Sequence, residues 1–143
     1  MPPQSASDAA FELHPRLAAD TLPVCELGAS SLLLMNDARY AWCVLVPRVH
    51  DVRELHALPE DVRNQVFAET MRVAAGLETL TGALKMNVAA LGNMVPQLHV
   101  HVIARHANDA AWPGPVWGVG QAQPYAQAAL AEQLARLRAR FAG

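Results

Sequence analysis

Length, composition and charge indicate a folded domain and exclude several functional classes. The chain has 143 residues, of which 52% are hydrophobic and 17% are charged, enough apolar material for one core. Its net charge is −2, so no surplus of basic residues points to a nucleic-acid backbone as partner. Its apolar runs are far shorter than the roughly 20 residues of a membrane span, and its start has no signal pattern. We therefore expect one domain over residues 1–143, cytoplasmic, with neither a nucleic-acid nor a membrane partner.

The first half of the chain predicts an antiparallel meander. Residues 1–10 are rich in Pro, Ser and Ala and are expected to be loose, and residues 11–20 predict a short helix. Apolar runs at 22–27, 31–35 and 42–46 predict three strands separated by short turn signals. Links this short can join antiparallel neighbours but cannot hold a crossover.

The second half predicts one long helix followed by a hairpin. Pro59 and two acidic residues mark the start of the helix, and Gly82 marks its end. Strands are expected over 84–91 and 97–105. The apolar face of the helix is predicted to comprise Val62, Val66, Phe67, Met71, Val73, Ala74, Leu77 and Leu80.

The tail of the chain has a different pattern. Residues 107–143 begin as a loop that carries Trp112 and Trp117, and they continue into a helix predicted over 124–141. Exposed tryptophans are costly, so the loop should pack on something. The two tryptophans are expected either to close a pocket or cross a dimer interface, or to cap the hydrophobic end of the sheet. The whole pattern predicts an α+β fold: an antiparallel sheet of about five strands, one long helix packed on it, and a C-terminal helix.

The densest polar pattern lies in the last predicted strand. Gln97, His99 and His101 alternate there with apolar residues, which predicts that all three side chains share one face. A single histidine on a strand is most simply a cross-strand hydrogen-bond partner, but a pair with a neighbouring amide makes that interpretation less favoured. The pair could also hold part of a zinc site, although its neighbours are amides, which are poor zinc ligands. The third interpretation is attack on phosphorus by an imidazole nitrogen, assisted by the second histidine and by the amides.

The stretch 97–103 resembles the signature of the histidine triad (HIT) superfamily, which alternates three histidines with apolar residues. The resemblance extends to Asn87, which matches an amide that reaches the phosphate, and to 92–94, where the family often has a Gly-Gln-Ser/Thr turn. Residues 34–37 resemble the segment that contacts the ribose. In all, the match covers about residues 11–106, and the tail departs from the best-known branches.

The resemblance implies a nucleotide hydrolase or nucleotidyl transferase that acts at the α-phosphorus of a nucleoside phosphate conjugate, such as a phosphoramidate or a dinucleoside polyphosphate. His99 would be the nucleophile that becomes nucleotidylated, and His101 would contact the phosphate or the leaving group. No metal or cofactor is implied. Superfamily members of this size are commonly homodimers, so a homodimer is expected.

The resemblance also assigns the substrate contacts. Asn36 or Asp37 would hold the ribose hydroxyls. Asn87 and Asn93 would hold phosphate oxygens, helped by the backbone amides of the turn at Asn93 and Met94.

Two positions depart from the family pattern. Gln97 replaces the first histidine, and glutamine can form hydrogen bonds but cannot carry a proton. Met94 replaces the hydroxyl residue of the turn and removes a contact to the leaving group. These departures motivate an alternative function, a non-catalytic or weakly active nucleotide-binding protein.

Overall fold

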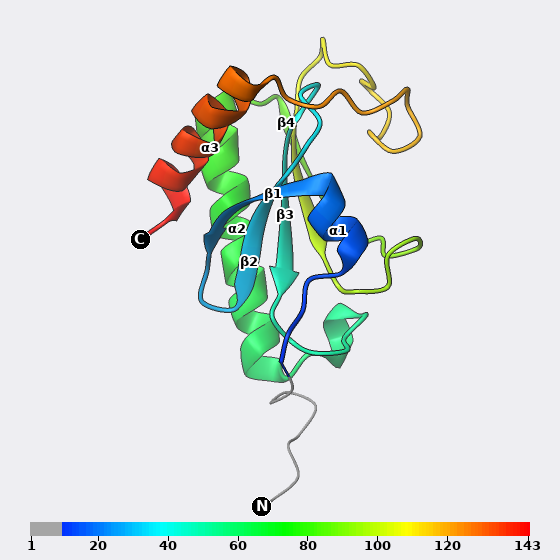
Figure 1. Cartoon of the computed structure of the whole chain (residues 1–143), viewed down its shortest axis with the longest axis vertical. Helices are drawn as coiled ribbons and strands as arrows, with labels where there is room; N and C mark the ends of the chain where they lie inside the picture. The colour runs from blue at the N-terminus through cyan, green and yellow to red at the C-terminus, as the bar shows by residue number, and fades with distance from the viewer. Residues whose placement is uncertain (1–9) are drawn as a thin grey trace, which may run out of the picture.

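The computed structural model describes residues 10–143, so the predicted loose start lies almost wholly outside the described residues. The described residues form one five-stranded antiparallel sheet in the order β1-β2-β3-β5-β4 (Figure 1). The strands are β1 (Thr21–Glu26), β2 (Ser30–Met35), β3 (Ala41–Pro47), β4 (Lys85–Ala89) and β5 (Val100–Arg105). The predicted α+β class, the meander of the first three strands and the antiparallel pairing of the last two are confirmed.

The helices are α1 (Pro15–Asp20), the short 3₁₀ turn η2 (Leu55–Ala57), α2 (Glu60–Thr81) and α3 (Gln127–Phe141). The long helix has the predicted bounds, because acids occupy its first turn and Gly82 takes the left-handed conformation (φ 65°) that ends it. The first helix is shorter than predicted, because it begins only at Pro15, where the imidazole of His14 accepts a hydrogen bond from the Arg16 N–H.

One face of the sheet packs on α2 and α3, and we call it the helix-packed face (Figure 1). Its buried side chains alternate along the strands with those of the other face, as the pleat requires. The part of its core contributed by β3, β5 and the two helices comprises Cys43, Leu45, Val73, Leu77, Val100, Val102, Ala104, Leu137 and Phe141.

The opposite face carries the histidines, and we call it the site face. It is covered by α1, through Leu17, and by the segment that links β5 to α3, through Val116. In Figure 1 this segment runs in yellow and orange around one end of the sheet, and α1 lies in front of the strands. A second apolar cluster on this face, containing Trp42, Val44 and Ile103, supports the site.

Two details of the prediction are wrong. The last strand begins at Val100 rather than at Gln97, and the Leu98 N–H donates to the backbone oxygen of Val52 at 2.9 Å rather than to a neighbouring strand. The predicted apolar face of α2 is only partly buried: Phe67 and Met71 are 47% and 53% exposed. Both residues lie next to the edge strand β4, around a small groove that Val88 also lines.

Candidate active site

Two buried imidazoles form the centre of the site face. His101 lies in β5 opposite Val44 of β3, and His99 immediately precedes β5. The residues His99 and His101 are 6% and 5% exposed, and their ring centroids are 4.9 Å apart in an edge-to-face arrangement. Both line a cavity of about 410 Å³, which we call the histidine cavity. Its wall also includes Arg16, Asp20, Met35, Trp42, Asn93, Met94 and Trp117.

The tautomer of His99 follows from its partner. The Nδ1 atom lies 2.7 Å from the backbone oxygen of Gln97, and a carbonyl oxygen can only accept a hydrogen bond. His99 Nδ1 therefore carries the proton. The lone pair of the neutral ring is then on Nε2, which is the atom that could act as a nucleophile.

His101 is held in the opposite tautomer. The indole Nε1–H of Trp42 donates to His101 Nδ1 at 3.0 Å, so the proton of the neutral ring is on Nε2. Burial, with a smaller effect of nearby His99, lowers the pKa of His101 to about 4, so the ring is neutral near pH 7. Trp117 packs edge-on against this ring, with centroids 5.1 Å apart. One histidine thus offers a lone pair and its neighbour offers an N–H, which is the arrangement needed to attack a phosphoryl group and stabilise its oxygens.

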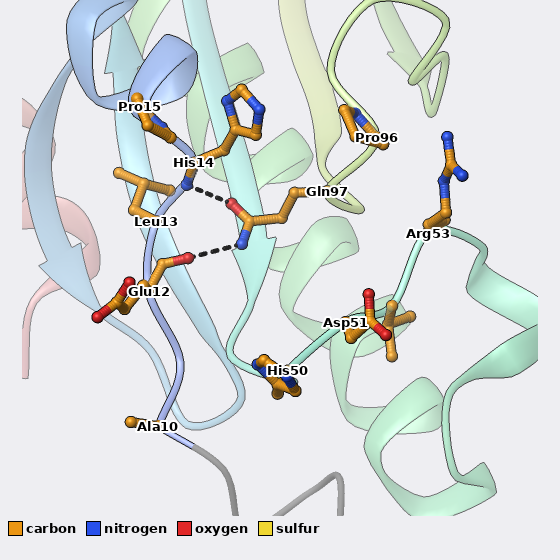
Figure 2. Close-up of a pocket in the computed structure, with 11 residues that line it drawn as sticks. Ala10, Glu12, Leu13, His14, Pro15, His50, Asp51, Arg53, Pro96 and Gln97 are labelled. Atoms are coloured by element: carbon orange, nitrogen blue, oxygen red, sulfur yellow. Dashed lines mark hydrogen bonds between the residues drawn. The ribbon is translucent and has the colours of Figure 1, made fainter.

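Gln97 does not join the two histidines, contrary to the predicted polar ladder of three. Its side-chain oxygen accepts from the backbone N–H of His14 at 2.8 Å, and its amide nitrogen donates to the backbone oxygen of Glu12 at 2.8 Å (Figure 2). Its amide therefore faces a separate cavity of about 430 Å³ beside the N-terminal segment. Gln97 acts on the site in two ways. Its backbone carbonyl orients His99, and its side chain holds residues 12–14 beside the segment that leads into β5.

The two ribose candidates are both engaged by other parts of the chain. Asp37 is 1% exposed and accepts hydrogen bonds from Arg39 and from the Gln123 N–H. Burial opposes the ionised form of Asp37, but these hydrogen bonds outweigh burial and hold the pKa of the carboxyl below its ordinary value. Asn36 Oδ1 accepts from the Tyr125 N–H at 2.9 Å.

Asn36 and Asp37 nevertheless line a cavity of about 530 Å³, which we call the loop cavity. It extends from the histidine cavity towards the tail, because both are lined by Arg16, Asp20, Met35, Trp42 and Trp117. Glycines of the tail, Gly118 and Gly120, form part of its wall. The two cavities together could hold a ligand longer than a phosphate group.

Asn87 lies on the site face but does not line either cavity. Its side-chain oxygen accepts from Arg105 at 2.8 Å. Arg105 is 1% exposed, forms two hydrogen bonds with the carboxylate of Asp109 at 2.8 and 3.0 Å, and donates to the Gly114 oxygen at 2.8 Å. The Arg105 guanidinium, together with backbone N–H donors, holds the pKa of Asp109 well below its ordinary value. This ion pair anchors the loop that brings Trp117 to the histidines.

The amide-bearing turn lies at the mouth of the histidine cavity. Asn93 and Met94 both line the cavity and are exposed, Met94 at 80%. The structure therefore brings together His99, His101, Asn93 and Met94, and it brings Asn36 and Asp37 close by in the adjoining cavity. It separates Gln97 and Asn87 from them.

Sequence reasoning missed several contributors to the site. Trp42 lies in a predicted apolar strand, where nothing in the sequence indicates its hydrogen bond to His101. The spacing of Arg16 and Asp20 likewise gives no sign that they line the same cavity as the histidines. The pair Arg105 and Asp109 had one usable signal, an opposite-charge pair four residues apart. Of the two tryptophans in the tail, Trp117 lines the histidine cavity, whereas Trp112 packs on Arg105, whose guanidinium carbon lies 5.6 Å from its ring centroid.

Residues 10–143 contain neither a metal-binding cluster nor a membrane-spanning helix. No cluster of three or more His, Cys, Asp or Glu side chains is arranged to hold a metal ion within that range. Across the same residues, none of the helices combines the length and the apolar character needed to cross a bilayer.

Comparison with known proteins identifies matches to a single family. The family model described as the HIT domain matches residues 16–108. The search of curated proteins found no match. A histidine triad protein from Sulfolobus tokodaii, described as nucleotide-binding, has 15% identity and a TM-score of 0.63 over 84% of this chain and 83% of its own, a likeness of fold.

Two bacterial structures are much more similar. A histidine triad protein from Marinobacter aquaeolei is 46% identical, covers 92% of this chain and 96% of its own, and superimposes with a TM-score of 0.90. One from Bradyrhizobium japonicum is 44% identical over 92% of this chain and 98% of its own, also with a TM-score of 0.90. With more than half of the chain matched by the family model, and with these relatives matched almost end to end, the chain belongs to the histidine triad (HIT) family.

Proposed function

We propose that this protein is a nucleotide hydrolase or nucleotidyl transferase that acts at the α-phosphorus of a nucleoside phosphate conjugate. The observation that carries the proposal is the pair of complementary tautomers. His99 presents an Nε2 lone pair and His101 presents an Nε2–H, and both line one cavity. A site that only binds a nucleotide needs hydrogen-bond donors, but it does not need a nucleophile oriented beside them.

The proposed reaction has two displacements. His99 Nε2 attacks the α-phosphorus, the phosphorus–nitrogen bond forms, and the bond to the leaving group breaks with its electron pair going to that group. Water, or another hydroxyl acceptor in a transfer reaction, then attacks phosphorus and loses its proton to solvent. The phosphorus–nitrogen bond breaks with its electron pair returning to His99 Nε2. Throughout, the Gln97 carbonyl keeps the proton on His99 Nδ1, and His101 Nε2–H hydrogen-bonds to a phosphoryl oxygen.

The two cavities divide the proposed substrate. The α-phosphate lies in the histidine cavity, where Asn93 and the turn amides at Met94 assist His101. The nucleoside extends into the loop cavity beside Asn36 and Asp37. Asn87 contributes indirectly, since its side-chain oxygen holds Arg105.

The test is capture of the covalent intermediate. The protein is incubated with adenosine and guanosine phosphoramidates and dinucleoside polyphosphates, and the mass of peptides that contain His99 is measured after rapid quenching. We expect a nucleotidyl adduct on His99, and we expect His99→Ala to lose both adduct and turnover. The exposed His56 lies outside the histidine cavity and supplies the matched control, His56→Ala, which retains both. Turnover that survives His99→Ala would contradict the proposal.

A non-catalytic nucleotide-binding role is the second candidate, and two departures from the family pattern favour it. Gln97 is committed to the N-terminal segment, and Met94 places an apolar side chain at the mouth of the cavity. This alternative predicts measurable AMP or GMP binding by calorimetry without product from any probe. Product formed by the wild type and lost in His99→Ala would exclude it.

A homodimer is part of the proposal, and an exposed apolar strip supports it. Phe67 and Met71 of α2 and Val88 of the edge strand β4 are 47%, 53% and 44% exposed, and they line one groove. A second copy of the chain could cover this strip and pair its own β4 along the same edge. Sedimentation equilibrium should show a dimer that Val88→Lys dissociates, whereas a monomeric wild type would contradict it. The cytoplasmic location and the lack of a nucleic-acid partner stay predictions.

A further inference from the structure

Trp42 contacts the second histidine through a hydrogen bond of fixed direction. An indole N–H can donate but has no lone pair to accept, so the 3.0 Å contact to His101 Nδ1 exists only when Nδ1 is unprotonated. Both side chains are buried, at 7% and 5% exposed. An indole N–H left unpaired in such a place loses a hydrogen bond that solvent does not replace. Protonation of His101 at Nδ1 would therefore cost this bond as well as the burial of a charge.

The surroundings of His101 contain little that would compensate for a positive charge. The titratable and charged side chains that line the histidine cavity are His99, from the same segment, and Arg16 and Asp20, from α1. Arg16 and Asp20 pair with each other at 3.1 Å. On the neighbouring strands, β3 contributes Trp42 and β4 places Ala89 opposite His101. The position next to Nδ1, where a carboxylate would stabilise an imidazolium, is occupied by the indole.

We infer that Trp42 is a positioning residue that locks His101 as an Nε2–H hydrogen-bond donor and leaves the site without an acid, so that it prefers substrates whose leaving group departs as a stable oxyanion. This inference rests on the proposed function and narrows its substrate class. The class it favours has a phosphate or an acidic alcohol on the α-phosphorus. The class it disfavours has an amine there.

The balance of protons explains the preference. When His99 attacks, the leaving group takes the electron pair of the broken bond. A phosphate or nitrophenolate anion is stable with that pair and needs no proton. An amine must gain a proton as it leaves, and neutral His101 could give one only by becoming an imidazolate, with the Trp42 N–H still directed at Nδ1. Gln97, the residue at the first position of the motif, has no proton to give.

The first experiment measures the tautomer directly. Full-length protein labelled with ¹⁵N-histidine is studied by long-range ¹H–¹⁵N NMR between pH 5 and 8, as wild type, Trp42→Phe and Trp117→Phe. Trp117 is the matched control, because its ring also packs on His101, with centroids 5.1 Å apart, while the hydrogen bond to Nδ1 comes from Trp42. We expect wild type and Trp117→Phe to keep His101 as Nε2–H, and Trp42→Phe to lose that single tautomer. A wild-type His101 that is cationic near pH 7, or a Trp42→Phe spectrum with unchanged His101 nitrogens, would overturn the inference.

The second experiment measures leaving-group preference. Initial rates of His99 nucleotidylation are compared for a 5′-(4-nitrophenyl phosphate) and a 5′-phosphoramidate of the same nucleoside, with adenosine and guanosine versions. The two substrates differ in intrinsic reactivity, but this difference is the same for wild type and Trp42→Phe. The readout is therefore the change in the ester-to-amidate ratio of kcat/KM from wild type to Trp42→Phe. We expect the ratio to fall roughly tenfold or more at pH 5 in Trp42→Phe, since a freed Nδ1 can take up a proton and general acids contribute about 10²–10⁴-fold.

The outcomes separate the two proposals. A wild type that nucleotidylates His99 faster from the phosphoramidate than from the ester overturns the leaving-group inference and leaves the proposed function intact. An ester-to-amidate ratio that is equal in wild type and Trp42→Phe also overturns it. The absence of an adduct from every probe overturns the proposed function, and the leaving-group inference with it.

Discussion

The helix-packed face of the sheet and the site face differ in the kind of contact that holds them together. The helix-packed face consists of apolar side chains from regular strands and helices. The site face is held by polar pairs that join irregular segments, such as Gln97 with His14, 83 residues away, and Asp37 with Gln123, 86 residues away. The comparison teaches that stability and chemistry are separable here: packing supports the sheet, and a few directed hydrogen bonds shape the site.

The largest loss of stability is expected at the Arg105–Asp109 ion pair. This pair belongs to the site face but is as deeply buried as the apolar core. Asp109→Ala leaves the Arg105 guanidinium, whose side chain is 2% exposed, without its carboxylate. We expect the free energy of unfolding to fall by about 3–5 kcal/mol, measured by urea denaturation. The control is Glu26→Ala in an ion pair whose Glu26 side chain is 67% exposed, where the loss should be at most about 1 kcal/mol. Equal losses in the two variants would contradict this.

The same carboxylate should make the fold sensitive to acid. The pKa of Asp109 is lowered from 3.8, chiefly by Arg105, so the unfolded chain takes up this proton at a higher pH than the folded chain does. The stabilisation by Asp109 is therefore complete above about pH 5 and is lost as the pH falls below about 4. Urea midpoints measured from pH 6 to pH 2 should decline more steeply in wild type than in Asp109→Ala. Parallel curves would show that the pair does not act this way.

A change on the helix-packed face should affect stability alone. Leu77→Ala removes a side chain that is 1% exposed between α2 and the sheet. We expect a loss of about 2–5 kcal/mol with an unchanged rate of His99 nucleotidylation at temperatures well below the transition. Leu84→Ala, at a position 63% exposed, is the control and should change neither quantity. A slower reaction in a still-folded Leu77→Ala would show that the two faces are coupled.

A smaller effect is expected from the tie at Gln97. Gln97→Ala removes two hydrogen bonds to the backbone of residues 12–14, and we expect a loss of about 1–3 kcal/mol. Hydrogen exchange should accelerate in residues 11–20, while His99 nucleotidylation persists because the carbonyl that orients His99 belongs to the backbone. Gln121→Ala, at an exposed position of the tail, is the control. Loss of the adduct in Gln97→Ala would assign the side chain a chemical role.

The smallest effect is expected at the mouth of the cavity. Met94 is 80% exposed, so Met94→Ser should change the free energy of unfolding by less than about 0.5 kcal/mol. A hydroxyl at this position adds at most one contact to a phosphate or leaving group, so we expect kcat/KM to change by less than roughly tenfold. A larger change would place Met94 among the groups that touch the reacting atoms.

The helix-packed face could be predicted from the sequence because its signals are local. Strand alternation, the acids at the start of α2 and Gly82 at its end each act within a few residues, and the sheet followed from them. The error at Phe67 and Met71 has the same cause: periodicity identifies an apolar side chain but does not say whether the chain itself buries it.

The site could be predicted only in part. Alternation placed His99 and His101 together, and the family resemblance gave them roles. Neither the alternation nor the resemblance could show that the side-chain amide of Gln97 bonds to the N-terminal segment, or that Arg105 donates to Asn87. Those contacts join residues far apart in sequence, and a glutamine or asparagine has no local preference that reveals its partner. The direction of the Trp42 hydrogen bond could not be predicted for the same reason.

The long reach of the contacts on the site face has a consequence for the order in which the molecule forms. Closing a loop costs more entropy as it lengthens, so contacts between distant residues form late unless other structure has brought them close. The hairpin that carries His101 needs only β4 and β5, which are neighbours along the chain. The segments that surround the site are held by the hydrogen bonds between Asp37 and Gln123 and between Gln97 and His14. We therefore expect β5 to be buried first during refolding and the cavity around His101 to close afterwards. The native fluorescence of Trp117 should then recover more slowly than the circular dichroism signal of the sheet.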